Sequence, residues 1–152
     1  MPTPEFPTLT HVDASGEARM VDVSEKAIST REAVATGVLR TTTEVADLLR
    51  QGRLPKGDAL ATARIAGIMA AKRTPDLVPL CHPIAISGVT VDLEVDEAEV
   101  RIAARVRTAD RTGVEMEALT AVAVAGLTLH DMVKAVDPAA VLDAVRVERK
   151  EG

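Results

Sequence analysis

Residues 113–136 put acidic and basic side chains on one side of an otherwise apolar segment. Steps of three or four residues from Glu117 reach Asp131 and Lys134, so a helix would place all three side chains in one stripe. An aspartate and a lysine three residues apart can pair and tune each other's proton affinity, which suits acid–base catalysis. The alternative is an exposed ion pair that contributes little to stability. Both interpretations of the stripe remain open from these residues alone.

A second candidate is a turn in which Lys56 and Gly57 precede a segment that Asp58 could cap as a helix. Free backbone N–H groups at a helix N-terminus and a neighbouring lysine together favour a phosphate group. The P-loop pattern is absent. The alternative is an ordinary turn with a solvated lysine. Arg64 lies inside the predicted helix, where it would extend to solvent unless the basic groups converge.

The third candidate is the loop 80–83, with the sequence LCHP, which proline stiffens. A positioned His82 could transfer protons or contact phosphate, and the alternative is a structural histidine. Cys81 beside it is a weak sign of nucleophilic catalysis, because adjacency in sequence is not the geometry required. His11, His82 and His130 show no metal-ligand spacing, so no metal site is expected.

Hydrophobic periodicity predicts the elements that must position these groups. Alternation is clearest in two strands around Val89–Val95 and Val100–Arg107, joined by a hairpin turn at 96–99. The other expected elements are a strand at 30–40, a helix from a Thr41–Glu44 capping box to about Arg50, a helix over 59–73, an ordered loop at 75–85, a helix opened by a Thr112–Glu115 capping box and stopped by Pro138, and a strand around Val145 and Val147.

The resulting order is β, two helices, β, β, α, β, which is the βαββαβ pattern of a ferredoxin-like sandwich. We therefore expect an α+β fold with an antiparallel sheet and helices on one face. Residues 1–10 contain three prolines and are predicted to be a flexible tail, followed by one domain over 11–152. Within its first segment, Met20–Val23 could form some strand.

The apolar residues are unusually small. The chain of 152 residues is 47% hydrophobic, yet its one aromatic residue is Phe6. A core of Ala, Val, Leu, Ile and Met lets elements approach closely, but each side chain buries little area. We therefore expect an extensive interface between subunits.

Charge and composition argue against several classes of protein. The net charge of −5 argues against a sequence-independent nucleic-acid binder. The single cysteine forms no intrachain disulfide. No apolar run approaches the length of a membrane span, and the N-terminus lacks the features of a signal peptide. We therefore expect a cytoplasmic location.

Three long segments of the sequence resemble one known family. They are LTHVDASGEARMVDVSEKAISTREA, KGDALATARIAGIMAAKRTPDLVPLCHP and TGVEMEALTAVAVAGLTLHDMVKAVDP. Together they resemble the molybdenum cofactor biosynthesis protein C family, and the likeness runs from about Leu9 to Val147. The tail is longer and richer in proline than the family's, but that difference does not touch the candidate sites.

The resemblance implies a ferredoxin-like hexamer, a trimer of dimers, and a cyclic pyranopterin monophosphate synthase activity. That activity is of the phosphorus–oxygen lyase type. It converts 3′,8-cyclo-7,8-dihydro-GTP to cyclic pyranopterin monophosphate with release of pyrophosphate. No cofactor is implied, although Mg²⁺ could accompany the triphosphate.

The resemblance also implies roles for particular positions. Asp131, Lys134 and Lys56 correspond to catalytic positions. The positions that bind substrate are Leu80, Cys81, His82, Met116, Glu117 and Arg31, with Arg64 a further candidate.

Two other functions remain to be distinguished. A non-catalytic, ferredoxin-like nucleotide sensor would need the phosphate site but not Asp131 or Lys134. An RNA-binding sheet would stack bases on aromatic side chains, which this chain lacks apart from Phe6.

Overall fold

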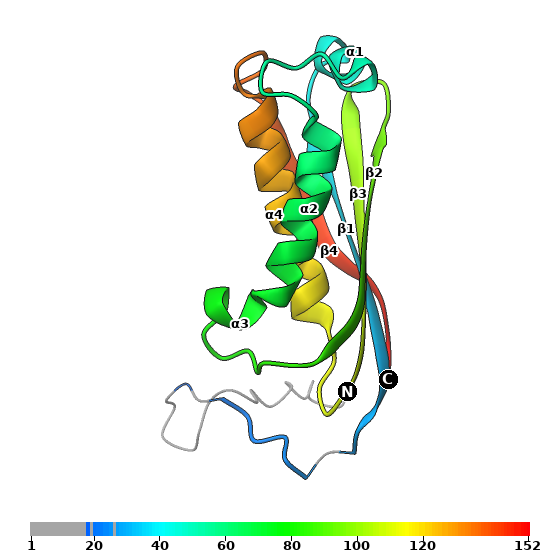
Figure 1. The fold of residues 1–152 in the computed structure, drawn as a ribbon, viewed down its shortest axis with the longest axis vertical. Helices are drawn as coiled ribbons and strands as arrows, with labels where there is room; N and C mark the ends of the chain where they lie inside the picture. The colour runs from blue at the N-terminus through cyan, green and yellow to red at the C-terminus, as the bar shows by residue number, and fades with distance from the viewer. Residues whose placement is uncertain (1–17, 19, 26) are drawn as a thin grey trace, which may run out of the picture.

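The computed structural model describes residues 18, 20–25 and 27–152, and it contains a four-stranded antiparallel sheet in the order β2-β3-β1-β4. In Figure 1, α2 and α4 lie side by side over one face of this sheet. The elements are β1 (Ser29–Arg40), α1 (Thr43–Gln51), α2 (Ala59–Lys72), α3 (Thr74–Leu77), β2 (Ile86–Val95), β3 (Glu99–Asp110), α4 (Glu115–Val133) and β4 (Val141–Glu151). The predicted α+β, ferredoxin-like fold is confirmed.

β1 is an inner strand, paired with β3 along its whole length and with β4 on its other side. Its residues alternate, so that Ala33, Ala35 and Leu39 are buried beneath the helices while their neighbours face the other way. The predicted hairpin joins β2 to β3, with the backbone N–H of Asp96 donating to the Glu99 carbonyl at 2.8 Å.

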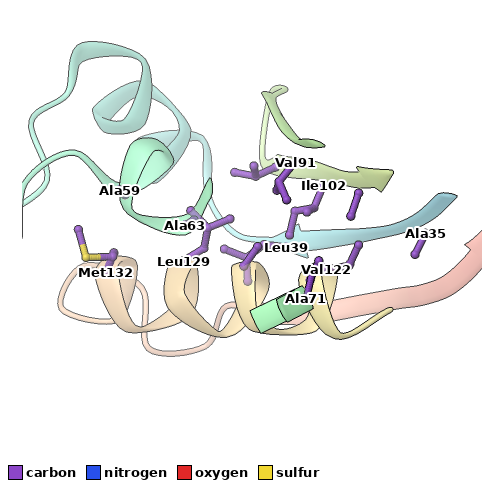
Figure 2. Packing of buried hydrophobic residues seen from close by; sticks show 14 of the residues in the cluster. Ala35, Leu39, Ala59, Ala63, Ala71, Val91, Ile102, Val122, Leu129 and Met132 are labelled. Carbon is purple, nitrogen blue, oxygen red and sulfur yellow. The ribbon is translucent and has the colours of Figure 1, made fainter. Parts of the chain in front are cut away.

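The core is built from small aliphatic side chains, as the composition predicted (Figure 2). Close approach of α2 to α4 depends on Gly67, because a Cβ atom there would lie 3.0 Å from the Ala121 carbonyl oxygen. The two helices run in opposite directions across the sheet (Figure 1), so the start of α2 is near the end of α4. This packing fixes the positions of both ends of α4.

Two of the three predicted helix caps were wrong. α1 is capped by Thr42, whose hydroxyl accepts from the Val45 N–H, whereas the Thr41 hydroxyl donates to Asp137 Oδ2 at 2.7 Å. α4 has no side-chain cap, because it begins at Glu115 with Val114 in the N-cap position, and the Glu115 carboxylate pairs with Lys150. The Asp58 cap of α2 is confirmed, since its Oδ1 accepts from the Ala61 N–H at 3.1 Å.

The segments flanking the predicted loops also differ in detail. Met20–Val23 form no strand. The loop expected over 75–85 begins within the helical turn α3, where Pro75 occupies a first-turn position that needs no N–H donor. The predicted tail, residues 1–10, lies outside the described residues.

α4 has the length and mean hydropathy of a membrane span, a property that the sequence interpretation missed. In the fold it packs against α2 and the sheet (Figure 1), and residues such as Ala121 and Leu129 are fully buried. The buried position of α4 explains its apolar composition, because it is the central helix of the core.

Candidate active site

Apart from the two arginines, the candidate residues gather at the two ends of α4. Lys56 precedes α2 and lies at the end of α4 that carries Asp131 and Lys134, whereas the loop between α3 and β2 lies at the start of α4 (Figure 1). Asp131 follows Glu117 by fourteen positions, which corresponds to about 21 Å along a helix. The polar stripe predicted on α4 therefore joins two separate groups of side chains.

The first group, the lysine–aspartate cluster, consists of Lys56, Asp131 and Lys134. Lys56 Nζ lies 2.9 Å from Asp131 Oδ2, and Lys134 Nζ lies 2.9 Å from Asp131 Oδ1. Gly57 has a φ of 105°, a conformation that other residues rarely adopt, so this glycine allows the turn that brings Lys56 to α4. All three side chains of the cluster are about half exposed and open to a ligand.

The two lysines strongly favour the charged form of Asp131. Hydrogen bonds from Lys134 and Lys56 lower the pKa of Asp131 to about 2. Asp131 is therefore a carboxylate throughout the physiological pH range, and it can orient the two cations. It has no proton to donate while both lysines contact it.

The second group surrounds a pocket of about 410 Å³ at the start of α4, which we call the α4 N-terminal pocket. Five of the six predicted substrate-binding residues line it: Leu80, Cys81, His82, Met116 and Glu117. The volume is within the range of sites for small molecules. The structure thus brings together residues from two segments that lie more than thirty positions apart in the sequence.

Glu117 is the buried acid of this pocket, with 2% of its surface exposed. Its pKa is raised, chiefly because burial disfavours the charged form. The Cys81 thiol donates to Glu117 Oε2 at 3.5 Å. Burial, followed by the proximity of Glu117, raises the pKa of Cys81 to about 11, so the thiol stays protonated at neutral pH and is a poor nucleophile.

The two predicted arginines lie outside the pocket lining. Arg31 Nε donates to the Asp110 carbonyl at 3.1 Å, which ties the start of β1 to the end of β3. Arg64 Nε donates to the Val91 carbonyl at 3.0 Å, so it links α2 to the sheet rather than extending freely into solvent.

Glu115 is a pocket residue that the sequence interpretation missed. It lines the α4 N-terminal pocket and lies 3.5 Å from Lys150 Nζ. The capping-box pattern had assigned its carboxylate to the backbone. Its spacing from Glu117 carried no signal of a shared pocket, because residues two positions apart on a helix do not face each other. Val21, Val23, Val78, Thr112 and Gly113 complete the lining.

Residues 18, 20–25 and 27–152 contain no group of three or more His, Cys, Asp or Glu side chains arranged to hold a metal ion.

The sequence of this chain is similar to one family of known proteins. The MoaC family model matches residues 20–152. A Mycobacterium tuberculosis protein named cyclic pyranopterin monophosphate synthase 2 is 62% identical over 144 residues, which cover 95% of this chain and 86% of the relative. A Streptomyces griseus cyclic pyranopterin monophosphate synthase is 65% identical, covering 95% and 81%. A Roseiflexus enzyme of that name is 58% identical, covering 95% and 92%. This chain therefore belongs to the MoaC family.

Proposed function

We propose that this protein is a cyclic pyranopterin monophosphate synthase of molybdenum cofactor biosynthesis. The observation that carries the proposal is 62–65% identity, over 95% of the chain, to proteins of that name. The reaction converts 3′,8-cyclo-7,8-dihydro-GTP to cyclic pyranopterin monophosphate and pyrophosphate, which makes the protein a phosphorus–oxygen lyase. No resident cofactor is part of the proposal, and Mg²⁺ would enter with the triphosphate.

The lysine–aspartate cluster is suited to the phosphate end of such a substrate. Lys56 and Lys134 carry two positive charges near one point, where they can stabilise charge that develops on the phosphate and the departing pyrophosphate. Asp131 holds both ammonium groups in place before substrate binds. Lys134 is the proposed proton donor, and a well-placed acid of this kind contributes roughly 10²–10⁴-fold.

The α4 N-terminal pocket is suited to the ring system. Glu117 can accept hydrogen bonds from the amino and ring N–H groups of the purine-derived ring. Met116, Leu80 and the nearby valines supply apolar contact area, and His82 supplies a polar group at the rim. Arg31 remains a proposed contact for the substrate.

One active site would combine these two groups from different subunits. About 21 Å separates them within one chain, which is too far for a single substrate to reach both reaction centres. Exposed apolar residues on the outer helical surface, Ile65, Met69 and Leu127, supply area for subunit contact. We propose a hexamer, a trimer of dimers, in the cytoplasm.

The test is to incubate the purified protein with 3′,8-cyclo-7,8-dihydro-GTP and to measure pyrophosphate and pterin together. Equal amounts of both are expected. Tight binding without either product would favour the nucleotide sensor, and the absence of binding would contradict both functions.

A further inference from the structure

Glu117 lies in an unusual environment for a buried acid. A carboxyl with 2% of its surface exposed normally pairs with a cation or several donors. In the part of the chain that the structure describes, no Lys, Arg or His lies within ion-pair distance of Glu117. Its carboxyl lines a pocket of about 410 Å³ that is large enough for a ring system.

The Cys81 thiol is the side-chain donor that reaches this carboxyl. The sulfur lies 3.5 Å from Glu117 Oε2, a normal distance for the larger sulfur atom. The loop that carries Cys81 is fixed locally. The backbone N–H of Cys81 donates to the Val78 carbonyl at 3.1 Å, and Pro83 follows two residues later. The thiol is protonated at neutral pH, since burial raises the pKa of Cys81 to about 11.

On the basis of the function proposed above, we propose that Cys81 is a positioning residue that acts through Glu117. Its thiol fixes the Glu117 carboxyl at the pocket wall, so that the carboxyl is ready to accept hydrogen bonds from N–H groups of the bound ring. Cys81 takes no covalent part in the reaction. A hydrogen-bond donor, rather than a sulfur atom, is what this position requires.

Replacement of the thiol tests this role. Cys81→Ala removes the donor and is expected to lower kcat/KM by about 3- to 10-fold, the value of one hydrogen bond. The loss should appear mainly in KM, because the ring is held in the ground state and the transition state alike. Cys81→Ser restores a donor and is expected to recover activity to within about threefold of the parent protein. Cys81→Val keeps apolar volume without a donor and replaces Cys81→Ala if that variant is unstable.

A double-mutant cycle shows whether Cys81 acts through Glu117. In a Glu117→Leu background, which removes the acceptor, Cys81→Ala should have little further effect on the Kd for substrate. An equal loss in both backgrounds would overturn the proposal.

Direct titration of the Glu117 carboxyl in the ligand-free protein gives a readout that is independent of activity. The thiol hydrogen bond lowers the pKa of Glu117 against the larger effect of burial. Its removal in Cys81→Ala should therefore raise that pKa, and Cys81→Ser should lower it again, as followed by the ¹³C carboxyl chemical shift. His82 on the loop, Glu115 on α4 and Lys72 at the end of α2 also face this region, and they remain unchanged in every variant.

The outcomes separate this inference from the proposed function. A Glu117 titration and a KM that are the same in the parent and Cys81→Ala proteins would overturn the positioning role. A parent protein that neither binds nor turns over substrate would overturn the proposed function, while the carboxyl titration would still decide whether the thiol acts on Glu117.

Discussion

At the scale of single residues, Asp131 determines the state of the lysine–aspartate cluster. Its two oxygens each contact one ammonium group at 2.9 Å, and the pKa of about 2 keeps it charged. Above pH 5, the ionisation of Asp131 therefore causes no change of the reaction rate with pH. Its proposed contribution to catalysis is to orient two cations, with the proton supplied by Lys134.

Asp131→Asn is expected to lower kcat by about 10²-fold or more, because both lysines lose the charge that orients them. The melting temperature should change little, since exposed ion pairs contribute little to stability. Asp143→Asn is the matched control, because Asp143 is similarly exposed and pairs with Arg40 at 3.0 Å on the opposite sheet face. Full turnover by Asp131→Asn in a steady-state assay would contradict this role.

Glu117→Gln should stabilise the ligand-free protein in a pH-dependent way. Burial raises the pKa of Glu117 above its ordinary value of 4.5, so the folded state retains a proton that the unfolded chain releases. The free energy of unfolding therefore falls as the pH rises from 4.5 through the raised pKa of Glu117. Glutamine does not titrate, so the substitution removes this loss. The melting temperature of the variant minus that of the parent protein should be larger at pH 8 than at pH 4. The same difference at both values would show that Glu117 is not the titrating group.

At the scale of the elements, the contact between α4 and β1 sets how closely α4 approaches the sheet. Gly37 in β1 is buried under Val122, and a Cβ atom there would lie 2.7 Å from Val122 Cγ1. Val122 has a β-branched side chain with few alternative rotamers, so it cannot easily move away. Any added atom at Gly37 must push α4 away from the sheet.

Gly37→Ala is therefore expected to lower the free energy of unfolding by about 1–3 kcal/mol, measured by urea denaturation. Gly88→Ala is the matched control, because Gly88 also lies in a strand and an added Cβ there would have no neighbour within 4 Å. That control should change stability by about 0.5 kcal/mol or less. Equal effects of the two substitutions would refute the packing argument.

Local patterns in the sequence predicted the elements well, because those patterns depend on neighbouring residues. Strict alternation gave the β2–β3 hairpin, and Asp58 gave the start of α2. The predicted Thr112–Glu115 cap was wrong, because α4 begins at Glu115 with Val114 in the N-cap position. The Glu115 carboxylate pairs with Lys150, which is 35 positions away and reaches it only through the fold. A capping pattern contains no information about such a partner.

The same reason explains what could be predicted of the candidate site. The spacing of Asp131 and Lys134 revealed their ion pair, because they are neighbours on one helix. The contacts of Lys56 with Asp131 and of Cys81 with Glu117 join distant segments, and only the resemblance to the family placed those residues in one list. Their actual contacts, and the separation of the two groups along α4, required the structure.

At the scale of the whole molecule, the proposed function requires a site shared between subunits, because the two groups lie at opposite ends of α4. The lysine–aspartate cluster of one subunit would face the α4 N-terminal pocket of its neighbour. A core of small side chains is consistent with a subunit that gains stability from such contacts.

Mixing two differently disabled variants tests this account most directly. Asp131→Asn subunits retain an intact pocket, and Glu117→Gln subunits retain an intact lysine–aspartate cluster. After joint unfolding and reassembly in equal amounts, random pairing gives about one quarter of the sites two intact halves, so about one quarter of the parent activity should return. Each variant reassembled alone should remain disabled. A mixture that assembles normally yet has no more pterin-forming activity than the separate variants would contradict the shared site.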